Sequence, residues 1–104
     1  MNDIRHVAVI GAGTMGHSLA LAFALAGHPV SLHDLGDETL ARARGMIASG
    51  LRTLVEMGSL DPNQPALALG RIQTTTRIEE AVSKADFVIE AISEDETAKK
   101  SLFL

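Results

Sequence analysis

Three glycines near the amino terminus have the spacing of a phosphate-binding loop. Gly11, Gly13 and Gly16 form a G-x-G-x-x-G pattern between an apolar run and a helical pattern. The remaining loop positions are Ala12, Thr14 and Met15. Gly11 permits a tight turn, Gly13 lets the backbone approach a diphosphate, and Gly16 allows close packing of helix on strand. Free amide groups at the helix start favour an anion. The alternative is a glycine turn that binds no ligand.

An acidic residue follows at the distance that a dinucleotide site requires. Asp34 ends a predicted second strand, about 18 residues after Gly16. A carboxylate at this place binds the hydroxyls of an adenosine ribose and repels a 2′-phosphate. Leu35 and Gly36 follow it and offer no arginine for such a phosphate. These residues favour NAD over NADP as the cofactor. In the alternative interpretation, Asp34 only begins a turn.

Strand and helix patterns alternate along the chain. We predict strands at residues 4–10, 29–34, 72–75 and 86–92. We predict helices at residues 14–26, 37–57 and 77–84, with a further helix that begins near Ser93 and reaches the last residue. Gly27 and Gly58 are expected to end the first two helices. Residues 59–70, which contain Pro62 and Pro65, are predicted to form a loop.

Apolar and capping residues give these helices expected faces and starts. The predicted apolar face of the first helix consists of Met15, Leu19, Ala22, Phe23 and Ala26. The small Ala20, one turn after Gly16, suits the same close packing on the strand. The predicted stripe of the long second helix consists of Leu40, Ala43, Ile47, Leu51 and Leu54. Thr76 and Glu79 have capping-box spacing before the third helix. The order of elements predicts an α/β fold with a parallel sheet of strand order 3-2-1-4, the first half of a doubly wound, Rossmann-type fold.

Composition narrows the class of protein. The 104 residues suffice for one small domain, and a net charge of −4 argues against a nucleic-acid partner. Cysteine is absent, which excludes disulfides and thiolate chemistry. No pair among the four histidines has helical spacing with a carboxylate partner, so we expect no metal site. No run is long enough to span a membrane, and no signal peptide is evident, so we expect a cytoplasmic protein.

Three segments together resemble the amino-terminal domain of the 3-hydroxyacyl-CoA dehydrogenase family. They are Val7–Gly16, the pair His33-Asp34, and Ala85–Asp95 followed by Lys99 and Leu102-Phe103. The glycine loop is shared by many nucleotide-binding proteins. The Glu-Ala-Ile-x-Glu-Asp sequence at residues 90–95, with a lysine shortly after, is more specific. The resemblance covers nearly the whole chain and implies an oxidoreductase that uses NAD.

The resemblance also implies roles for residues near the carboxyl end. Ala91 and Glu94 match positions that line the nicotinamide-ribose side of the cofactor, and Lys99 matches a lysine near the same place. Glu94 could instead only favour a helix start, and Lys99 could be an exposed helix lysine. Residues 11–16 match the phosphate loop, and Asp34 matches the carboxylate that binds the adenosine ribose.

The sequence departs from the family pattern at positions that contact the substrate. Acyl-CoA-using members have a serine and a lysine where this chain has Gly50 and Met57. The segment from Leu54 to Leu60 also resembles relatives that oxidise free 3-hydroxy acids. The choice between an acyl-CoA and a free hydroxy acid therefore stays open.

The family's catalytic residues have no counterpart in this chain. The resemblance implies a general-base histidine, its glutamate, a serine and an asparagine, all beyond the last predicted helix. We therefore expect residues 1–104 to be a truncated NAD-binding domain without catalytic residues, and an unpaired fourth strand predicts a homo-oligomer. The expected whole enzyme moves a hydride between C3 of a 3-hydroxyacyl substrate and NAD. The alternatives are a non-catalytic nucleotide-sensing half-domain and a flavin-binding half-domain, which residues 90–99 fit poorly.

Overall fold

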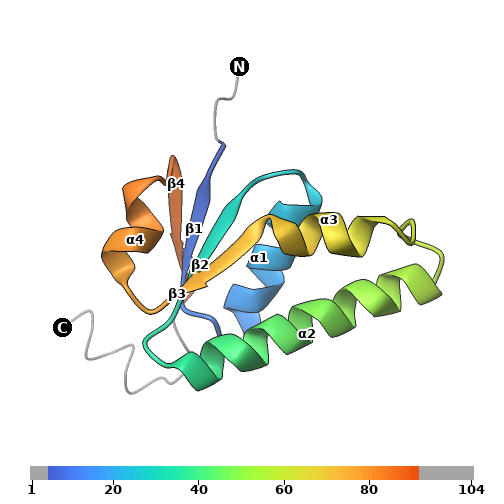
Figure 1. The fold of residues 1–104 in the computed structure, drawn as a ribbon, viewed down its shortest axis with the longest axis horizontal. Coiled ribbons are helices and arrows are strands. Elements are labelled where there is room, and N and C mark those ends of the chain that lie inside the picture. Colours follow the sequence, from blue (N-terminus) through green and yellow to red (C-terminus); the bar gives the residue numbers. More distant parts are fainter. Residues whose placement is uncertain (1–4, 92–104) are drawn as a thin grey trace.

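The computed structural model describes residues 5–91, in which strands and helices alternate as predicted (Figure 1). The elements are β1 (Val7–Ile10), α1 (Thr14–Leu25), β2 (Val30–His33), α2 (Asp37–Glu56), α3 (Gln64–Gly70), β3 (Ile72–Thr75), α4 (Ile78–Ser83) and β4 (Phe87–Glu90). The predicted α/β class is confirmed. The predicted helix after residue 92 lies outside the described residues.

The four strands form one parallel sheet of order β3-β2-β1-β4, as the sequence predicts. Ile10, at the end of β1, lies opposite His33 of β2 and Glu90 of β4. The carboxyl ends of the strands therefore meet along one edge. Cofactors bind outside this edge in doubly wound sheets, so the fold brings the glycine loop and Asp34 to the expected side.

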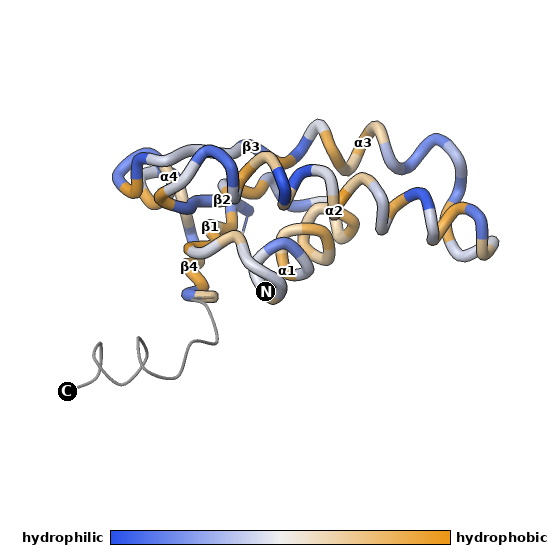
Figure 2. Tube along the Cα trace, turned by 90° about the horizontal axis from the view of Figure 1, so that it is seen from below, coloured by the Kyte–Doolittle hydropathy of each residue, from blue (hydrophilic) through white to orange (hydrophobic). Residues whose placement is uncertain are grey.

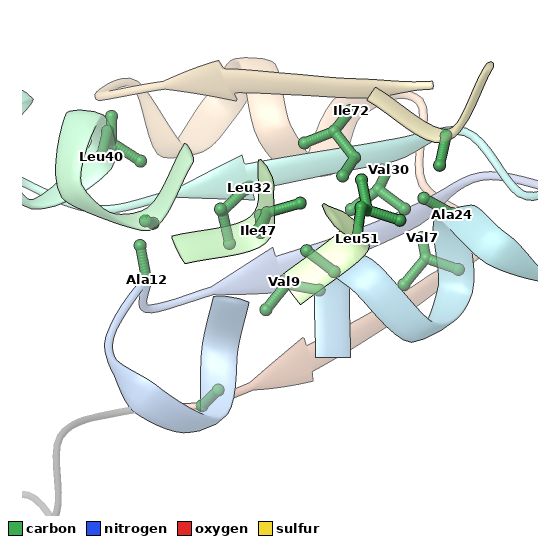
Figure 3. Packing of buried hydrophobic residues seen from close by; sticks show 14 residues of the cluster. Val7, Val9, Ala12, Ala24, Val30, Leu32, Leu40, Ile47, Leu51 and Ile72 are labelled. Atoms are coloured by element: carbon green, nitrogen blue, oxygen red, sulfur yellow. The ribbon is translucent and has the colours of Figure 1, made fainter. Parts of the chain in front are cut away.

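Helices cover both faces of the sheet. Figure 1 shows α4 on one side and α1, α2 and α3 on the other. The core lies on the face that α1, α2 and α3 cover, where Leu32 of β2 packs with Ile47 and Leu51 of α2 (Figure 3). In Figure 2, hydrophobic and hydrophilic colours alternate along α2, because its apolar stripe is buried and its other face is exposed. The predicted stripe is confirmed, although Leu54 is only half-buried.

The predicted apolar face of α1 is not the buried one, whereas Gly16 and Ala20, which are predicted to suit close packing on the strand, are buried. The buried residues of this helix are Gly16, Ala20 and Ala24. Of the predicted face, Leu19 and Phe23 are only partly buried, and the exposed members are Met15, Ala22 and Ala26. Side chains four residues apart share one side of a helix, so the three small residues form a narrow strip. A strip without bulk lets α1 approach the sheet more closely than a strip of large side chains would.

Residues 59–70 are not a loop throughout, because they include α3. Pro65 occupies the first turn of this helix, where its missing N–H leaves no hydrogen bond unmade. Ala68 is fully buried and belongs to the core. The prolines therefore mark the start of a helix here.

The predicted capping pair before α4 is also wrong. No side chain caps α4 at Arg77, its first flanking residue. The Thr75 hydroxyl accepts a hydrogen bond from the Arg77 backbone N–H (3.0 Å) and donates one to Glu80 Oε1 (2.7 Å). Thr75 and Glu80 thus hold the chain before α4 through side-chain bonds, without capping the helix and without the predicted Thr76 and Glu79.

The fourth strand is shorter than predicted. Within residues 5–91, β4 pairs with β1 alone, and its side chains Phe87 and Val88 are 42% and 46% exposed. An exposed strand edge of this kind can pair with another strand. Self-association through it stays a prediction.

Candidate dinucleotide-binding site

The loop between β1 and α1 turns sharply at Gly11. This residue has a φ of +105°, which lies in the left-handed region that favours glycine. Its backbone N–H donates a 2.7 Å hydrogen bond to the carbonyl oxygen of His33, at the end of β2. The turn is therefore fixed to the neighbouring strand before the chain enters α1.

Gly16 brings the first turn of α1 against the loop. A Cβ on Gly16 would overlap the carbonyl oxygen of Gly11 and lie 2.7 Å from its carbonyl carbon. The same Cβ position is 3.7 Å from the Cβ of Ala91. Ala91 is buried, and its N–H donates to the carbonyl oxygen of Ile10 (2.7 Å). The loop, the helix start and the end of β4 thus converge, as the sequence motif requires.

The start of α1 is open to an anion. Gly13 precedes the helix, and a Cβ placed on it would meet no atom within 4 Å. No side chain caps the helix, and its first turn holds no acidic residue. The first backbone N–H groups of a helix lack partners within the helix and carry a partial positive charge. An approaching diphosphate therefore has both space and donors there.

Asp34 lies against the same loop. Its Oδ2 accepts a 2.9 Å hydrogen bond from the backbone N–H of Ala12, and its Oδ1 accepts one from Leu35 (2.8 Å). The Gly36 N–H approaches Oδ1 at 3.4 Å. These bonds hold the half-buried carboxylate at the loop without using all its acceptor positions, of which a carboxylate has about four. Hydroxyl groups of a ribose are suitable donors for the remainder.

The predicted site residues are therefore brought together as far as they are described. Gly11 through Gly16, Asp34 and Ala91 lie at one place on the carboxyl edge of the sheet. The Met15 side chain is 53% exposed at the first turn of α1. Glu94 and Lys99 lie outside the described residues. These features fit the adenosine-diphosphate part of NAD, since they provide a carboxylate, free amides and space.

Side chains of α2 form a wall beside the loop that the sequence motifs do not predict. A hollow of about 120 Å³ lies beside the loop, and its lining residues are Ala12, Gly13, Thr14, Thr39, Arg42, Ala43 and Met46. Thr39, Arg42, Ala43 and Met46 lie on one side of α2, and their helical spacing is the signal in the sequence that could have indicated this wall. Two larger hollows, of about 410 and 390 Å³, flank β3 and do not include the loop.

The two positions that depart from the family pattern, one on α2 and one just after it, differ in their surroundings. A Cβ on Gly50 would lie 3.3 Å from Leu21 Cδ2, so this position faces α1. Met57 follows the helix end and is 69% exposed. A small residue at position 50 lets α1 and α2 approach each other.

The described part of the chain holds neither a cluster of metal ligands nor a membrane-spanning helix. Residues 5–91 contain no group of three or more metal-ligating side chains, and no helix among them is long and apolar enough to cross a membrane.

Comparisons with known proteins agree with this geometry. Residues 6–104 match the family described as "3-hydroxyacyl-CoA dehydrogenase, NAD binding domain". The chain is 42% identical to the 3-hydroxyadipyl-CoA dehydrogenase of Escherichia coli K12, over 99% of this chain and 22% of that protein. It is 34% identical to the 5-formyl-3-hydroxy-2-methylpyridine 4-carboxylate 5-dehydrogenase of Mesorhizobium japonicum, over 96% of this chain and 31% of that protein.

A solved structure gives the same result. The (S)-3-hydroxybutyryl-CoA dehydrogenase of Ralstonia eutropha superposes with a TM-score of 0.85 at 34% identity, over 97% of this chain and 35% of that one. The chain thus spans about a fifth to a third of the length of each of these three relatives. With a Rossmann-type sheet, the glycine loop and Asp34 in place, the chain belongs to the family of NAD-binding domains of 3-hydroxyacyl-CoA dehydrogenases, whose cofactor is NAD.

Proposed function

We propose that this chain binds NAD for an oxidoreductase that transfers a hydride between NAD and C3 of a 3-hydroxyacyl-CoA or a related 3-hydroxy acid. The hydrogen bond from Ala12 N–H to Asp34 Oδ2 carries the proposal, because it places a carboxylate beside an uncapped helix start. Residues 1–104 form the NAD-binding domain in this proposal. The general base and the substrate-binding domain come from other residues of the enzyme.

Each residue of the site has a defined task in this proposal. The backbone N–H groups at the start of α1 bind the diphosphate, and Asp34 accepts hydrogen bonds from the adenosine ribose. Ala91 keeps the end of β4 small beside the loop. Ala91 and Glu94 line the nicotinamide-ribose side and Lys99 lies near it, as the family resemblance implies. NAD supplies the hydride acceptor when it is bound.

The relatives' names include both coenzyme A thioesters and a free carboxylate. Two of those compared carry coenzyme A thioesters in their names, and the Mesorhizobium enzyme is named for a pyridine carboxylate. Gly50 and Met57 provide neither a hydroxyl nor a charge for a coenzyme A phosphate. The proposal therefore includes free 3-hydroxy acids beside thioesters.

Calorimetric titration tests the binding function directly. NAD, NADP and ADP-ribose are titrated into the chain, into Asp34→Ala and into the control Asp61→Ala, which changes an exposed carboxylate in the α2–α3 turn. We expect NAD and ADP-ribose to bind better than NADP, and Asp34→Ala to lose about tenfold in affinity, since hydrogen bonds to a charged group contribute about 1.5–3 kcal/mol. Equal binding by Asp34→Ala and Asp61→Ala, in folded proteins, would contradict the proposal.

A turnover assay tests whether the catalytic residues lie outside residues 1–104. The pure chain with NAD and 3-hydroxybutyryl-CoA is expected to form no NADH, because the family resemblance places the general-base histidine beyond the last predicted helix. Formation of NADH by this chain alone would show that catalytic residues lie within residues 1–104.

A further inference from the structure

A side chain of α2 faces the phosphate loop from outside the glycine motif. Thr39, Arg42, Ala43 and Met46 have i, i+3, i+4 and i+7 spacing, so they share one side of the helix. Together they form the wall of the 120 Å³ hollow that faces Ala12, Gly13 and Thr14. Arg42 is the one cationic side chain among these lining residues.

Two alanines hold α2 close to the loop. Ala12 and Ala43 are 3% and 1% exposed, and both belong to the core cluster. Figure 3 shows Ala12 facing the first turns of α2, the part of the helix that carries Leu40. Arg42 adjoins Ala43 and is exposed, so its flexible side chain starts at the mouth of the hollow.

The Arg42 guanidinium is available for a ligand. Within residues 5–91, no hydrogen bond of this group is observed, whereas Arg44 donates to Thr74 Oγ1 (3.1 Å) and Arg71 donates to the Ala24 carbonyl oxygen (2.8 Å). Glu38, four residues earlier on α2, is the carboxylate that helix geometry brings within reach of Arg42. Such an exposed pair is weak and would not compete strongly with a phosphate.

A cation near the loop would offset the repulsion between the Asp34 carboxylate and a bound phosphate. The Asp34 carboxylate is held at the loop by Ala12, and it repels any phosphate that binds nearby. The amides at the start of α1 offer only partial charges. A guanidinium adds a full charge and presents paired donors that match two oxygens of one phosphate.

We propose that Arg42 binds a phosphate oxygen of the dinucleotide's diphosphate across this hollow, and so is a further cofactor-binding residue. The inference rests on the proposed NAD-binding function. A phosphate of a coenzyme A substrate has the same chemistry, and the experiment separates the two sources.

Ligand titrations of Arg42→Gln test the assignment, with Arg52→Gln as the matched control. Arg52 is also exposed on α2, roughly 15 Å further along the helix. We expect Arg42→Gln to weaken NAD and ADP-ribose about tenfold, to leave adenosine binding unchanged, and to reduce the dependence on salt. Arg42→Lys should recover part of the affinity, because it restores the charge without the planar fork. Arg52→Gln should behave as the unmodified chain.

Other outcomes would overturn the assignment. Equal affinities in Arg42→Gln and Arg52→Gln would show that Arg42 makes no phosphate contact. A loss confined to coenzyme A, with ADP-ribose unaffected, would assign the cation to a substrate phosphate instead. If the unmodified chain and Asp34→Ala both fail to bind NAD and ADP-ribose, the proposed function itself fails. Matching unfolding curves of the two arginine variants verify that each is folded.

Discussion

The backbone N–H of Ala12 donates a 2.9 Å hydrogen bond to Asp34 Oδ2, which ties the loop after β1 to the end of β2. The second carboxylate oxygen accepts from Leu35, so both oxygens are engaged by backbone donors. The residue expected to bind the ribose therefore also shapes the loop that binds the diphosphate. A change at Asp34 is expected to affect stability as well as affinity.

Asp34→Asn should destabilise the fold even without a ligand. An asparagine has one oxygen and one NH₂ group, so it can accept from either Ala12 or Leu35 but not from both. We expect a loss of about 1 kcal/mol in the free energy of unfolding, and faster hydrogen exchange at the Ala12 amide. Urea unfolding and exchange measurements check this. Asp61→Asn, with the same change of charge, should leave both quantities unaltered, and an equal effect there would refute the role of the carboxylate.

Gly16→Ala should be more harmful than an ordinary glycine replacement. The new Cβ would overlap the Gly11 carbonyl, so the loop or the helix must shift. We expect a cost of about 1–3 kcal/mol, as for overpacking in a core, together with weaker NAD binding. Gly45→Ala is the control, because its Cβ meets no atom within 4 Å and alanine favours helix. Comparable urea midpoints for the two variants would contradict the close contact.

The sequence predicts the parts of this fold that depend on pattern and spacing. The alternation of apolar strands with helices determines the order β3-β2-β1-β4, and the glycine spacing locates the loop. The glycine spacing also predicts the close packing of Gly16, which agrees with the overlap that a Cβ there would make with Gly11. The apolar pattern alone fails on α1, because it places Met15 on the packed face, whereas the buried residues are Gly16, Ala20 and Ala24.

Two further features depend on contacts that the sequence does not display. A proline such as Pro65 suits both a turn and the first turn of a helix. The structure shows that a helix follows, and it packs on the core through Ala68. Arg42 has the spacing of an exposed helix residue, and its position beside the loop arises from the tertiary packing of Ala43 against the core. Tertiary packing therefore brings α2, which supplies four of the seven lining residues, to the hollow beside the loop.

His33→Leu should stabilise the protein. His33 is 5% exposed, and within residues 5–91 neither ring nitrogen has a hydrogen-bond partner. An unpaired buried polar group costs about 1–3 kcal/mol, and leucine has a similar volume without polar atoms. We expect a higher Tm and a gain of about 1 kcal/mol or more in urea unfolding.

Ser31 provides the contrast to His33 on the same strand. It is equally buried, but its hydroxyl lies 2.7 Å from His6 Nε2 and is satisfied. Ser31→Ala should therefore lower the free energy of unfolding by about 0.5–1.5 kcal/mol. If both replacements change stability in the same direction, hydrogen bonding does not distinguish these two positions.

Asp86 should make the sheet sensitive to acid. Its Oδ2 accepts hydrogen bonds from the backbone N–H groups of His6 (3.0 Å) and Arg5 (2.9 Å), and these bonds lower the pKa of the carboxyl below its ordinary value. The ionised form is therefore favoured by folding. The resulting stability is present above the unfolded pKa of about 3.9 and is lost as the pH falls through the lower, folded value. Because Asp86 precedes β4 and its donors precede β1, acid should loosen this strand pair first.

Urea unfolding at a series of pH values checks this with Asp86→Asn. The variant should show a smaller fall in urea midpoint below about pH 4, while Asp61→Asn keeps the original profile. The β4 amides of Asp86→Asn should also exchange faster at neutral pH. An unchanged acid profile in Asp86→Asn would show that other carboxylates govern the unfolding.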